Sequence, residues 1–253
     1  MYSHAFRVLV VDDEPDSHAI ISMMLSRQDL YPVETCLYAA DLFQAELMMH
    51  IWHPDWIIVD LDLTETHGFS VAERMHDMDE TELTFITAHE RNTAQILAFS
   101  EIHLLLKPLN KKALMDVLQD MLIHQPYHEK HIRLATLKHN ITQTDAPPML
   151  AVPVQLSWMG VSINDIVHIS QQDGFALLVL ENTRLLAEKS FDDYLRLFIK
   201  LAGFLQIHPM HLVQLNHVAE IDTDHREVLM NNGTVLPVAA HKLQILLQAV
   251  PKF

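Results

Sequence analysis

Short apolar runs alternate with amphipathic stretches over the first 124 residues of the chain. Each run has the length and composition of a strand that is buried on both faces of a sheet. Between the runs, apolar side chains recur at helical spacing, and Pro15 and Asn110 suit the first turn and the N-cap of two such helices. Five strand-then-helix units predict an α/β domain with a doubly wound, parallel five-stranded sheet. The predicted strands are Phe6–Val11, Val33–Cys36, Trp56–Val59, Thr84–Ile86 and Leu104–Leu106.

The pattern changes after residue 124, where prolines punctuate a stretch rich in histidine, lysine, threonine and asparagine. We interpret residues 125–152 as a linker that contains a helical piece near Glu129–Leu137. The sequence therefore predicts two domains, residues 1–124 and residues 153–253, joined by this linker.

The segment after the linker is dominated by short runs of apolar and β-branched residues, which are typical of strands. Asp173-Gly174 and Asn232-Gly233 are turn signals between successive strands. The sequence Ser190–Asp193 resembles a capping box at the start of a helix, and a last amphipathic stretch covers Ala239–Leu247. Residues 153–253 are therefore predicted to form a mostly-β domain with two helices.

Charge distinguishes the two predicted domains. The formal net charge is −16, of which residues 1–124 carry −14, residues 125–150 carry +1 and residues 151–253 carry −3. The first segment should repel nucleic acid, whereas the last is nearly neutral. Apolar residues make up 49% of the chain, which is enough to form buried cores in both domains.

The N-terminus and the cysteine content indicate a cellular compartment. Cys36 is the single cysteine, which excludes a disulfide within the chain and suits a reducing environment. The first apolar run stops at two aspartates and is too short for a signal peptide or a membrane span. We therefore expect a cytoplasmic protein with no membrane association.

Charged and hydroxyl side chains mark the ends of four predicted strands. Asp12 and Asp13 end the first strand, Asp60 ends the third, Thr87 the fourth and Lys107 the fifth. In a doubly wound sheet these ends open on one edge, where ligands bind. Neighbouring carboxylates repel one another, a cost that a divalent cation offsets, and hard oxygen ligands suit Mg²⁺.

This set of groups fits phosphoryl transfer. With the metal bound, Asp60 can attack a phosphoryl group, while Lys107 and the metal neutralise the charge on its oxygens. Thr87 can donate its hydroxyl to a phosphoryl oxygen. Any one of these residues alone would more simply be a solvated strand-end residue, but the full set in chain order favours a reactive pocket.

Residues 6–124 resemble the CheY-like receiver domain of two-component response regulators. The resemblance is carried by Val10–Glu14, Pro54–Asp60, Gly68, Phe85–Ala88 and Leu106–Pro108. It implies that Asp60 is the phosphoacceptor, that Thr87 and Lys107 bind the phosphoryl group, and that the small Ala88 leaves room for the donor. It also implies a cis bond between Lys107 and Pro108. The implied Mg²⁺ ligands are Asp13, Asp60, the backbone carbonyl of Asp62 and, through water, Asp12.

Two positions depart from the receiver pattern. Leu104 stands where the family usually has an aromatic residue that responds to the phosphate, and Thr64 stands where it often has proline. Neither departure removes a chemical group from the pocket. Phosphorylation is therefore better supported than the switch that follows it.

Residues 153–253 resemble the LytTR DNA-binding domain. The resemblance is carried by Ile163–Ile169, Ser190-Phe191, Phe204–His208, Leu212-Val213 and Asn231–Val238. It implies loops that enter successive major grooves with polar and basic side chains, while lysine and arginine neutralise phosphates. The candidates for DNA contact are Gln171, Gln172, Lys189, His208, His241 and Lys242.

Several positions that the LytTR pattern fills with polar or basic residues are different in this chain. Pro209 and Met210 follow His208, Gln214 replaces an asparagine, and Ala239 and Ala240 stand where serine and arginine are preferred. The six histidines of the domain could offset part of the missing charge.

Two functions remain open. The first is a transcription regulator that a sensor histidine kinase phosphorylates on Asp60 and that binds promoter DNA as a homodimer. The second is a phosphorylation-controlled protein-interaction module whose DNA surface has decayed. Fold analogy favours the first, and the charge balance favours the second.

An enzyme is a third reading of the acidic pocket. Asp62 has the spacing from Asp60 at which aspartyl phosphatases place a second catalytic aspartate, but the paired Asp12 and Asp13 suit a receiver better. We expect self-phosphorylation from a partner's phosphohistidine, not turnover of a free substrate.

Overall fold

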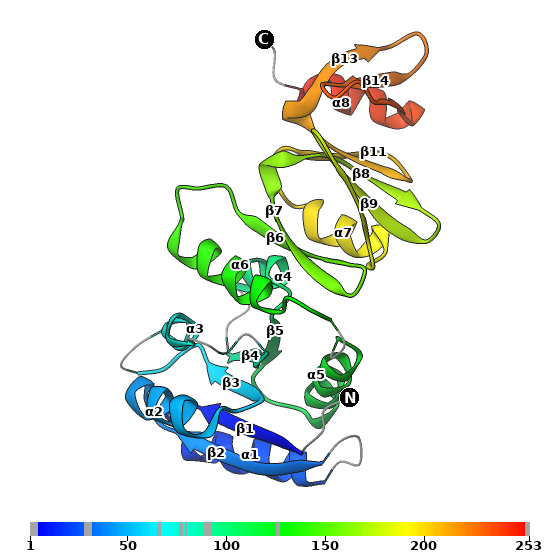
Figure 1. Cartoon of the computed structure of the whole chain (residues 1–253). Coiled ribbons are helices and arrows are strands. Elements are labelled where there is room, and N and C mark those ends of the chain that lie inside the picture. The colour runs from blue at the N-terminus through cyan, green and yellow to red at the C-terminus, as the bar shows by residue number, and fades with distance from the viewer. Residues whose placement is uncertain are drawn as a thin grey trace. The chain divides into compact units, whose positions relative to one another are not determined.

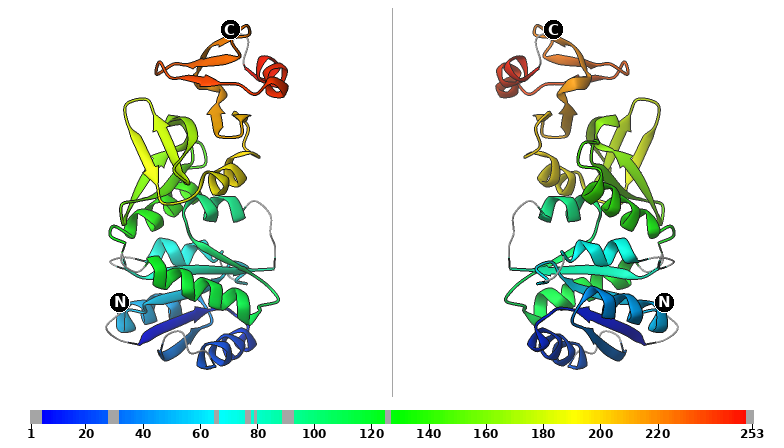
Figure 2. Two further views of the ribbon diagram at one scale, coloured as in Figure 1. Left: turned by 90° about the vertical axis from the view of Figure 1, so that its right-hand side faces the viewer. Right: turned by 90° about the vertical axis from the view of Figure 1, so that its left-hand side faces the viewer.

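The computed structural model describes residues 5–27, 32–64, 67–75, 78, 80–88, 93–124 and 127–250. The chain divides into two compact units, which Figures 1 and 2 show from three sides. The first unit runs to Thr144 and includes Leu156–Trp158, and the second comprises Asp145–Gln155 and the residues from Met159 onward. Among the residues described, no helix combines the length and apolar character needed to span a membrane.

A parallel five-stranded sheet forms the centre of the first unit, as the sequence predicts, and its strand order is β2-β1-β3-β4-β5 (Figure 1). All residues of β3 and β4 are buried, which explains why these strands read as continuous apolar runs and not as alternating ones. The strands are β1 (Phe6–Val11), β2 (Val33–Ala39), β3 (Trp56–Asp60), β4 (Glu82–Thr87) and β5 (His103–Leu106).

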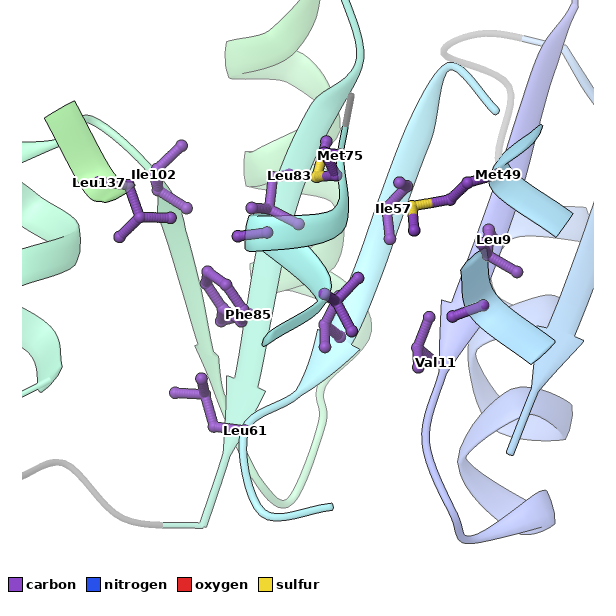
Figure 3. Close-up of a cluster of buried hydrophobic side chains, with 14 of the residues drawn as sticks. Leu9, Val11, Met49, Ile57, Leu61, Met75, Leu83, Phe85, Ile102 and Leu137 are labelled. Atoms are coloured by element: carbon purple, nitrogen blue, oxygen red, sulfur yellow. The ribbon is translucent and has the colours of Figure 1, made fainter. Parts of the chain in front are cut away.

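Helices pack on both faces of this sheet. On one face, α1 and α5 cover a cluster that includes Phe6, Ile58 and Leu118. On the other face, Met49 of α2, Met75 after α3 and further apolar side chains cover β1, β3 and β4 (Figure 3). The helices are α1 (Pro15–Ser26), α2 (Leu42–Trp52), α3 (Phe69–Arg74), α4 (Thr93–Phe99), α5 (Lys111–His124) and α6 (His131–Thr142).

Helix α6 lies in the segment that the sequence assigns to a linker. The expected helical piece exists, but Leu137 is fully buried in the second of these clusters, beside Ile102 (Figure 3). Helix α6 contacts α3 and α4, which are only six and seven residues long. The compact unit therefore continues to Thr144 instead of ending at residue 124, because α6 supplies apolar cover that these short helices lack.

A buried ion pair also fastens α6 to the sheet. The Arg133 guanidinium donates to Glu82 Oε2 at 2.7 Å, and Lys130 Nζ lies 3.2 Å from Glu82 Oε1. Burial acts to raise the pKa of Glu82, but the charges of Arg133 and Lys130 outweigh it and lower the pKa. On its other side, the Arg133 guanidinium lies 5.1 Å from the ring centroid of Trp158.

The second unit is built on an antiparallel sheet with order β10-β9-β8-β12-β11. Asp173-Gly174 turns between β8 and β9, and both residues have positive φ, as the turn signal predicts. Smaller sheets pair β6 with β7 and join β13, β14 and β15. The strands are β6 (Met149–Val154), β7 (Ser157–Ser162), β8 (Ile166–Gln172), β9 (Phe175–Leu180), β10 (Arg184–Ala187), β11 (Phe204–His208), β12 (His211–Gln214), β13 (Val218–Asp222), β14 (Glu227–Met230) and β15 (Val235–Pro237).

Two α-helices complete the described part of this unit. Helix α7 (Phe191–Phe198) opens with the predicted capping box, in which the Ser190 and Asp193 side chains each accept from the other's backbone N–H. Helix α8 (Leu243–Ala249) starts later than the predicted Ala239, because a 3-10 turn over Ala240–Lys242 precedes it. The mostly-β fold with two helices is thereby confirmed.

Candidate functional site

Three carboxylates meet at the carboxyl edge of the parallel sheet. Asp12 follows β1 and Asp60 ends β3, so the pairing of these neighbouring strands places them side by side. One oxygen each of Asp12, Asp13 and Asp60 lies within 4.8 Å of the others. Asp12 and Asp60 are buried, and Asp12 Oδ2 forms an ion pair with Lys107 Nζ at 3.3 Å. Buried carboxylate oxygens that converge in this way fit a hard divalent cation such as Mg²⁺.

The Lys107 side chain brings a positive charge next to these carboxylates. Its Nζ lies 2.5 Å from Asp60 Oδ2, 3.3 Å from Asp12 Oδ2 and 3.5 Å from Glu14 Oε2. Burial acts to lower the pKa of Lys107, but the hydrogen bond to Asp60 and the charges of Asp12 and Asp60 outweigh it and raise the pKa. Lys107 therefore remains protonated beside Asp60. Its bond to Pro108 is cis, as predicted.

Thr64 contacts the third carboxylate. Its backbone N–H donates to Asp13 Oδ2 at 3.1 Å, and its hydroxyl donates to the same oxygen. The hydroxyl hydrogen bond from Thr64 is the main reason that the pKa of Asp13 lies below its usual value. A proline at position 64 would supply neither donor. This departure from the receiver pattern therefore adds two hydrogen bonds to an expected metal ligand.

The Asp62 side chain makes a contact that the sequence did not predict. Its Oδ2 accepts from Thr87 Oγ1 at 2.9 Å, and the Ala88 N–H lies 3.4 Å from the same oxygen. Strands β3 and β4 pair with Asp60 opposite Ile86, so the residues just beyond them meet. The signal in the sequence was an acidic residue two positions after Asp60, although its partner depends on the register of the strands.

Gly68 lets the chain return close to the acceptor. Its N–H donates to the Leu61 carbonyl at 3.2 Å, and an added Cβ would lie 2.3 Å from the Asp60 carbonyl oxygen. Side-chain carbons do not approach oxygen this closely, so a larger residue at position 68 requires a shift of its own segment or of the Asp60 backbone.

All six candidates for DNA contact gather at one end of the antiparallel sheet in the second unit. At this end β8 and β11 finish, β9 and β12 begin, and the chain leaves β10. The Gln171 N–H donates to the Met210 carbonyl at 3.0 Å, the Ala176 N–H to the Lys189 carbonyl at 2.9 Å, and the Ala239 N–H to the Ile207 carbonyl at 2.8 Å. The candidates at this sheet end are Gln171, Gln172, Lys189, His208, His241 and Lys242.

The sheet end carries apolar as well as polar side chains. Met210 and Phe175 are 42% and 44% exposed there. The sequence marked Met210 as a departure from the LytTR pattern and did not single out Phe175. A histidine chain lies just inside: Ser170 Oγ is 3.0 Å from His168 Nδ1 and 2.8 Å from His211 Nδ1. Burial lowers the pKa of His168 to about 4 and also lowers that of His211. These two histidines are therefore neutral at pH 7 and do not offset the missing arginines.

Comparison with known families agrees with both halves of this description. Residues 8–119 match the family model of the response regulator receiver domain, and residues 157–250 match that of the LytTr DNA-binding domain. A response regulator receiver domain is therefore followed in this chain by a LytTr DNA-binding domain. Both expected family resemblances are thereby confirmed, in the expected order along the chain.

Curated relatives of this regulator extend over nearly the whole chain. The sensory transduction protein LytT of Bacillus cereus is 24% identical over 247 residues, which are 92% of this chain and 94% of the relative. The sensory transduction protein LytR of Streptococcus mutans is 24% identical and covers 91% of this chain and 93% of its own. The transcriptional regulatory protein BtsR of Escherichia coli is 21% identical, with coverages of 96% and 98%.

Solved structures align with one unit of the regulator at a time. The chemotaxis protein CheY4 of Vibrio cholerae aligns with 47% of this chain and 99% of its own, at 25% identity and a TM-score of 0.41. A LytTr DNA-binding domain of a putative methyl-accepting/DNA response regulator from Bacillus cereus aligns with 39% of this chain and 95% of its own, at 20% identity and a TM-score of 0.35.

Proposed function

We propose that this regulator accepts a phosphoryl group on Asp60 from the phosphohistidine of a sensor kinase, and that phosphorylation controls the binding of its LytTR domain to DNA. The observation that carries the first part is the contact of 2.5 Å between Asp60 and the protonated Lys107, beside Asp12 and Asp13. Such a carboxylate is buried, fixed in position and next to a compensating cation.

The chemistry follows from these positions. An Asp60 oxygen attacks phosphorus, so that an O–P bond forms and the P–N bond of the phosphohistidine breaks with its electron pair going to the imidazole nitrogen. Lys107 stabilises the negative oxygens of the transferred group, and Thr87 and the Ala88 N–H are the donors for one of them. When bound, Mg²⁺ supplies further neutralisation of these oxygens. Asp13, Asp60 and the Asp62 carbonyl would hold it, with Asp12 acting through water.

Phosphorylation of the full-length protein with phosphoramidate and Mg²⁺ tests the acceptor. The wild type should gain one phosphoryl group by intact mass, and Asp60→Asn should gain none. Equal labelling of the two proteins would place the acceptor elsewhere.

The output is proposed to be DNA binding by a phosphorylated homodimer through the sheet end defined above. The clustering of all six candidates at one end of the sheet supports this proposal. The probe is a duplex from the region upstream of the regulator's own gene, with an unrelated duplex as the comparison. Binding that requires phosphorylation and weakens steeply with added salt supports a DNA function.

A second function has a specific observation in its favour. Lys189 and Lys242 are the only lysine or arginine residues among the six candidates, and the exposed Met210 and Phe175 lie at the same sheet end. Apolar side chains of this kind are typical of protein interfaces. If the phosphorylated protein fails to bind either duplex at low salt, a protein-interaction output replaces DNA binding.

A further inference from the structure

Two hydrogen-bond donors that a phosphoryl group needs already have an anionic partner. The Thr87 hydroxyl donates to Asp62 Oδ2 at 2.9 Å, and the backbone N–H of Ala88 lies 3.4 Å from the same oxygen. A hydroxyl has a single hydrogen to donate, so Thr87 cannot serve Asp62 and a phosphoryl oxygen at the same time. The carboxylate of Asp62 and a phosphoryl group on Asp60 therefore compete for one place.

The backbone fixes Asp62 at this place. Its N–H donates to Asp60 Oδ1 at 2.9 Å, while Lys107 holds the other oxygen of Asp60 at 2.5 Å. The carboxylate of Asp62 thus lies across the end of β3 and reaches the end of β4, where Thr87 and Ala88 stand. A negative oxygen is therefore tethered two residues from the acceptor, on the side from which Thr87 would approach the phosphoryl group.

We propose that Asp62 is an internal stand-in for the phosphoryl group: a tethered carboxylate that engages Thr87 and Ala88 in the unphosphorylated protein and leaves them when Asp60 is phosphorylated. This inference rests on the proposed role of Asp60 as acceptor. Like-charge repulsion between the incoming phosphoryl oxygens and the Asp62 carboxylate displaces that carboxylate. Asp62 thereby opposes phosphorylation and sets how strong a phosphodonor must be.

In the unphosphorylated protein, the place for the phosphoryl group is therefore occupied by the Asp62 carboxylate. Because Asp62 already holds the Thr87 hydroxyl toward the site, arrival of phosphate exchanges one anionic acceptor for another instead of drawing Thr87 in from outside. Asp62 acts here as a positioning residue for Thr87. A role in hydrolysis alone, as in an aspartyl phosphatase, would leave the equilibrium binding of a phosphoryl mimic unchanged.

Binding of beryllofluoride, which mimics a phosphoryl group on an aspartate, measures this competition directly. Full-length wild type, Asp62→Ala, Asp62→Asn and Asp60→Asn are titrated by calorimetry at saturating Mg²⁺. Asp62→Ala should bind beryllofluoride about tenfold more tightly, which corresponds to about 1.4 kcal/mol. Asp62→Asn should lie between, because the amide keeps an acceptor for Thr87 and loses the charge. The rate of labelling by phosphoramidate should rise in the same order.

A control variant separates the position of the Asp62 carboxylate from the loss of one negative charge. Asp116→Ala removes one exposed carboxylate from α5, where it pairs with Lys112, and should leave the affinity for beryllofluoride unchanged. Saturating Mg²⁺ is needed because removal of Asp62 also lowers the attraction for the cation, which acts in the opposite direction. If Asp62→Ala fails to fold, Asp62→Asn alone shows whether loss of the Asp62 charge raises or lowers the affinity for beryllofluoride.

The outcomes separate this inference from the proposed acceptor. Binding that depends on Asp60 but is equal or weaker in Asp62→Ala leaves the acceptor in place and overturns the stand-in. A change confined to the rate of dephosphorylation overturns it as well. Equal binding by the wild type and Asp60→Asn, or binding by neither, overturns both proposals.

Discussion

The acceptor site of the first unit and the sheet end of the second unit are both formed where neighbouring strands end. They differ in how many of their family's functional side chains they keep. In both, neighbouring strands end together, so residues far apart in the sequence meet at one edge. At the first edge one oxygen each of Asp12, Asp13 and Asp60 lies within 4.8 Å of the others, and Lys107 pairs with Asp12 and Asp60. At the second, positions that the LytTR pattern fills with serine and arginine hold Ala239 and Ala240.

The two sites also differ in how much stability is lost when a side chain is replaced. At the acceptor site Lys107 forms ion pairs with the buried carboxylates of Asp12 and Asp60, so removing Lys107 leaves buried charge uncompensated. The six candidate side chains at the sheet end are exposed or partly exposed, so they can be exchanged at little cost in stability. Evolution can therefore change the output surface while the acceptor stays intact.

Removal of Lys107 should give the largest effect. Lys107→Met takes away the cation next to Asp60 and should reduce the rate of labelling by phosphoramidate by about 10²–10³-fold, the range for losing one preorganised electrostatic group. Lys112→Met is the matched control, because Lys112 is exposed on α5 and pairs only with Asp116 among the contacts found in the described residues. A similar loss in both variants would mean that net charge, and not the contact with Asp60, sets the rate.

The second unit should respond to pH through His168. Its folded-state pKa of about 4 lies below the ordinary value of 6.5, chiefly because it is buried, with His211 and Arg184 adding to the effect. Between these values the unfolded chain binds more protons, so the stability of this unit should fall as the pH drops from 6.5 to 4. The full loss is about 3 kcal/mol from a difference of this size.

Thermal unfolding at a series of pH values checks this prediction. His168→Phe should flatten the dependence between pH 6.5 and 4 for the transition assigned to the second unit, whereas His241→Gln, which alters an exposed histidine, serves as the control. An unchanged slope in His168→Phe would show that other groups cause the acid sensitivity.

Substitution of Gly68 should slow labelling by phosphoramidate nearly as much as substitution of Lys107, although Gly68 has no side chain to react. Gly68→Ala places a Cβ 2.3 Å from the Asp60 carbonyl oxygen, and we expect the backbone of the acceptor to shift in response. A misplacement of about 1 Å in a reacting group costs about 10²-fold in rate, and we expect a loss of this order in phosphoramidate labelling. Labelling at the wild-type rate would show that the loop moves away without disturbing Asp60.

These regions also differ in how far the sequence predicts them. The parallel sheet follows from continuous apolar runs, and its order of strands brings Asp12, Asp60, Thr87 and Lys107 together as expected. The contact of Asp62 with Thr87 does not follow, because it depends on the register of β3 and β4 and on the direction of one side chain. The hydrogen bonds from Thr64 to Asp13 could not be predicted from the sequence either, because they depend on how two loops approach each other.

Amino-acid composition gave a wrong prediction for α6, where polar residues belong to a helix that packs on the core. Helix α6 carries two histidines, an arginine and a lysine and follows Pro126, which favours a linker. Its Leu137 is nevertheless part of the buried core. The hairpin of β6 and β7 turns at Gln155-Leu156, and both residues have positive φ. Glycine or asparagine is the usual signal for that conformation, so the turn left no trace in the sequence.

The smallest predicted effect is a gain at the sheet end. Ala240→Arg restores a basic side chain at a position where the LytTR pattern prefers one, beside His241 and Lys242. One new phosphate contact should steepen the dependence of log affinity on log salt by about one, with a gain of up to about tenfold in affinity at low salt. Anisotropy titrations of the phosphorylated protein with the upstream duplex measure both quantities.

A matched variant shows whether this gain depends on position. Gln248→Arg adds the same charge to an exposed residue of α8, outside the six candidates. If only Ala240→Arg binds more tightly, the sheet end faces DNA and its missing arginines limit the affinity. If both variants gain equally, general attraction between positive charge and DNA explains the change. If neither gains, the sheet end does not meet phosphates, and the exposed Met210 and Phe175 become the surface to test for a protein partner.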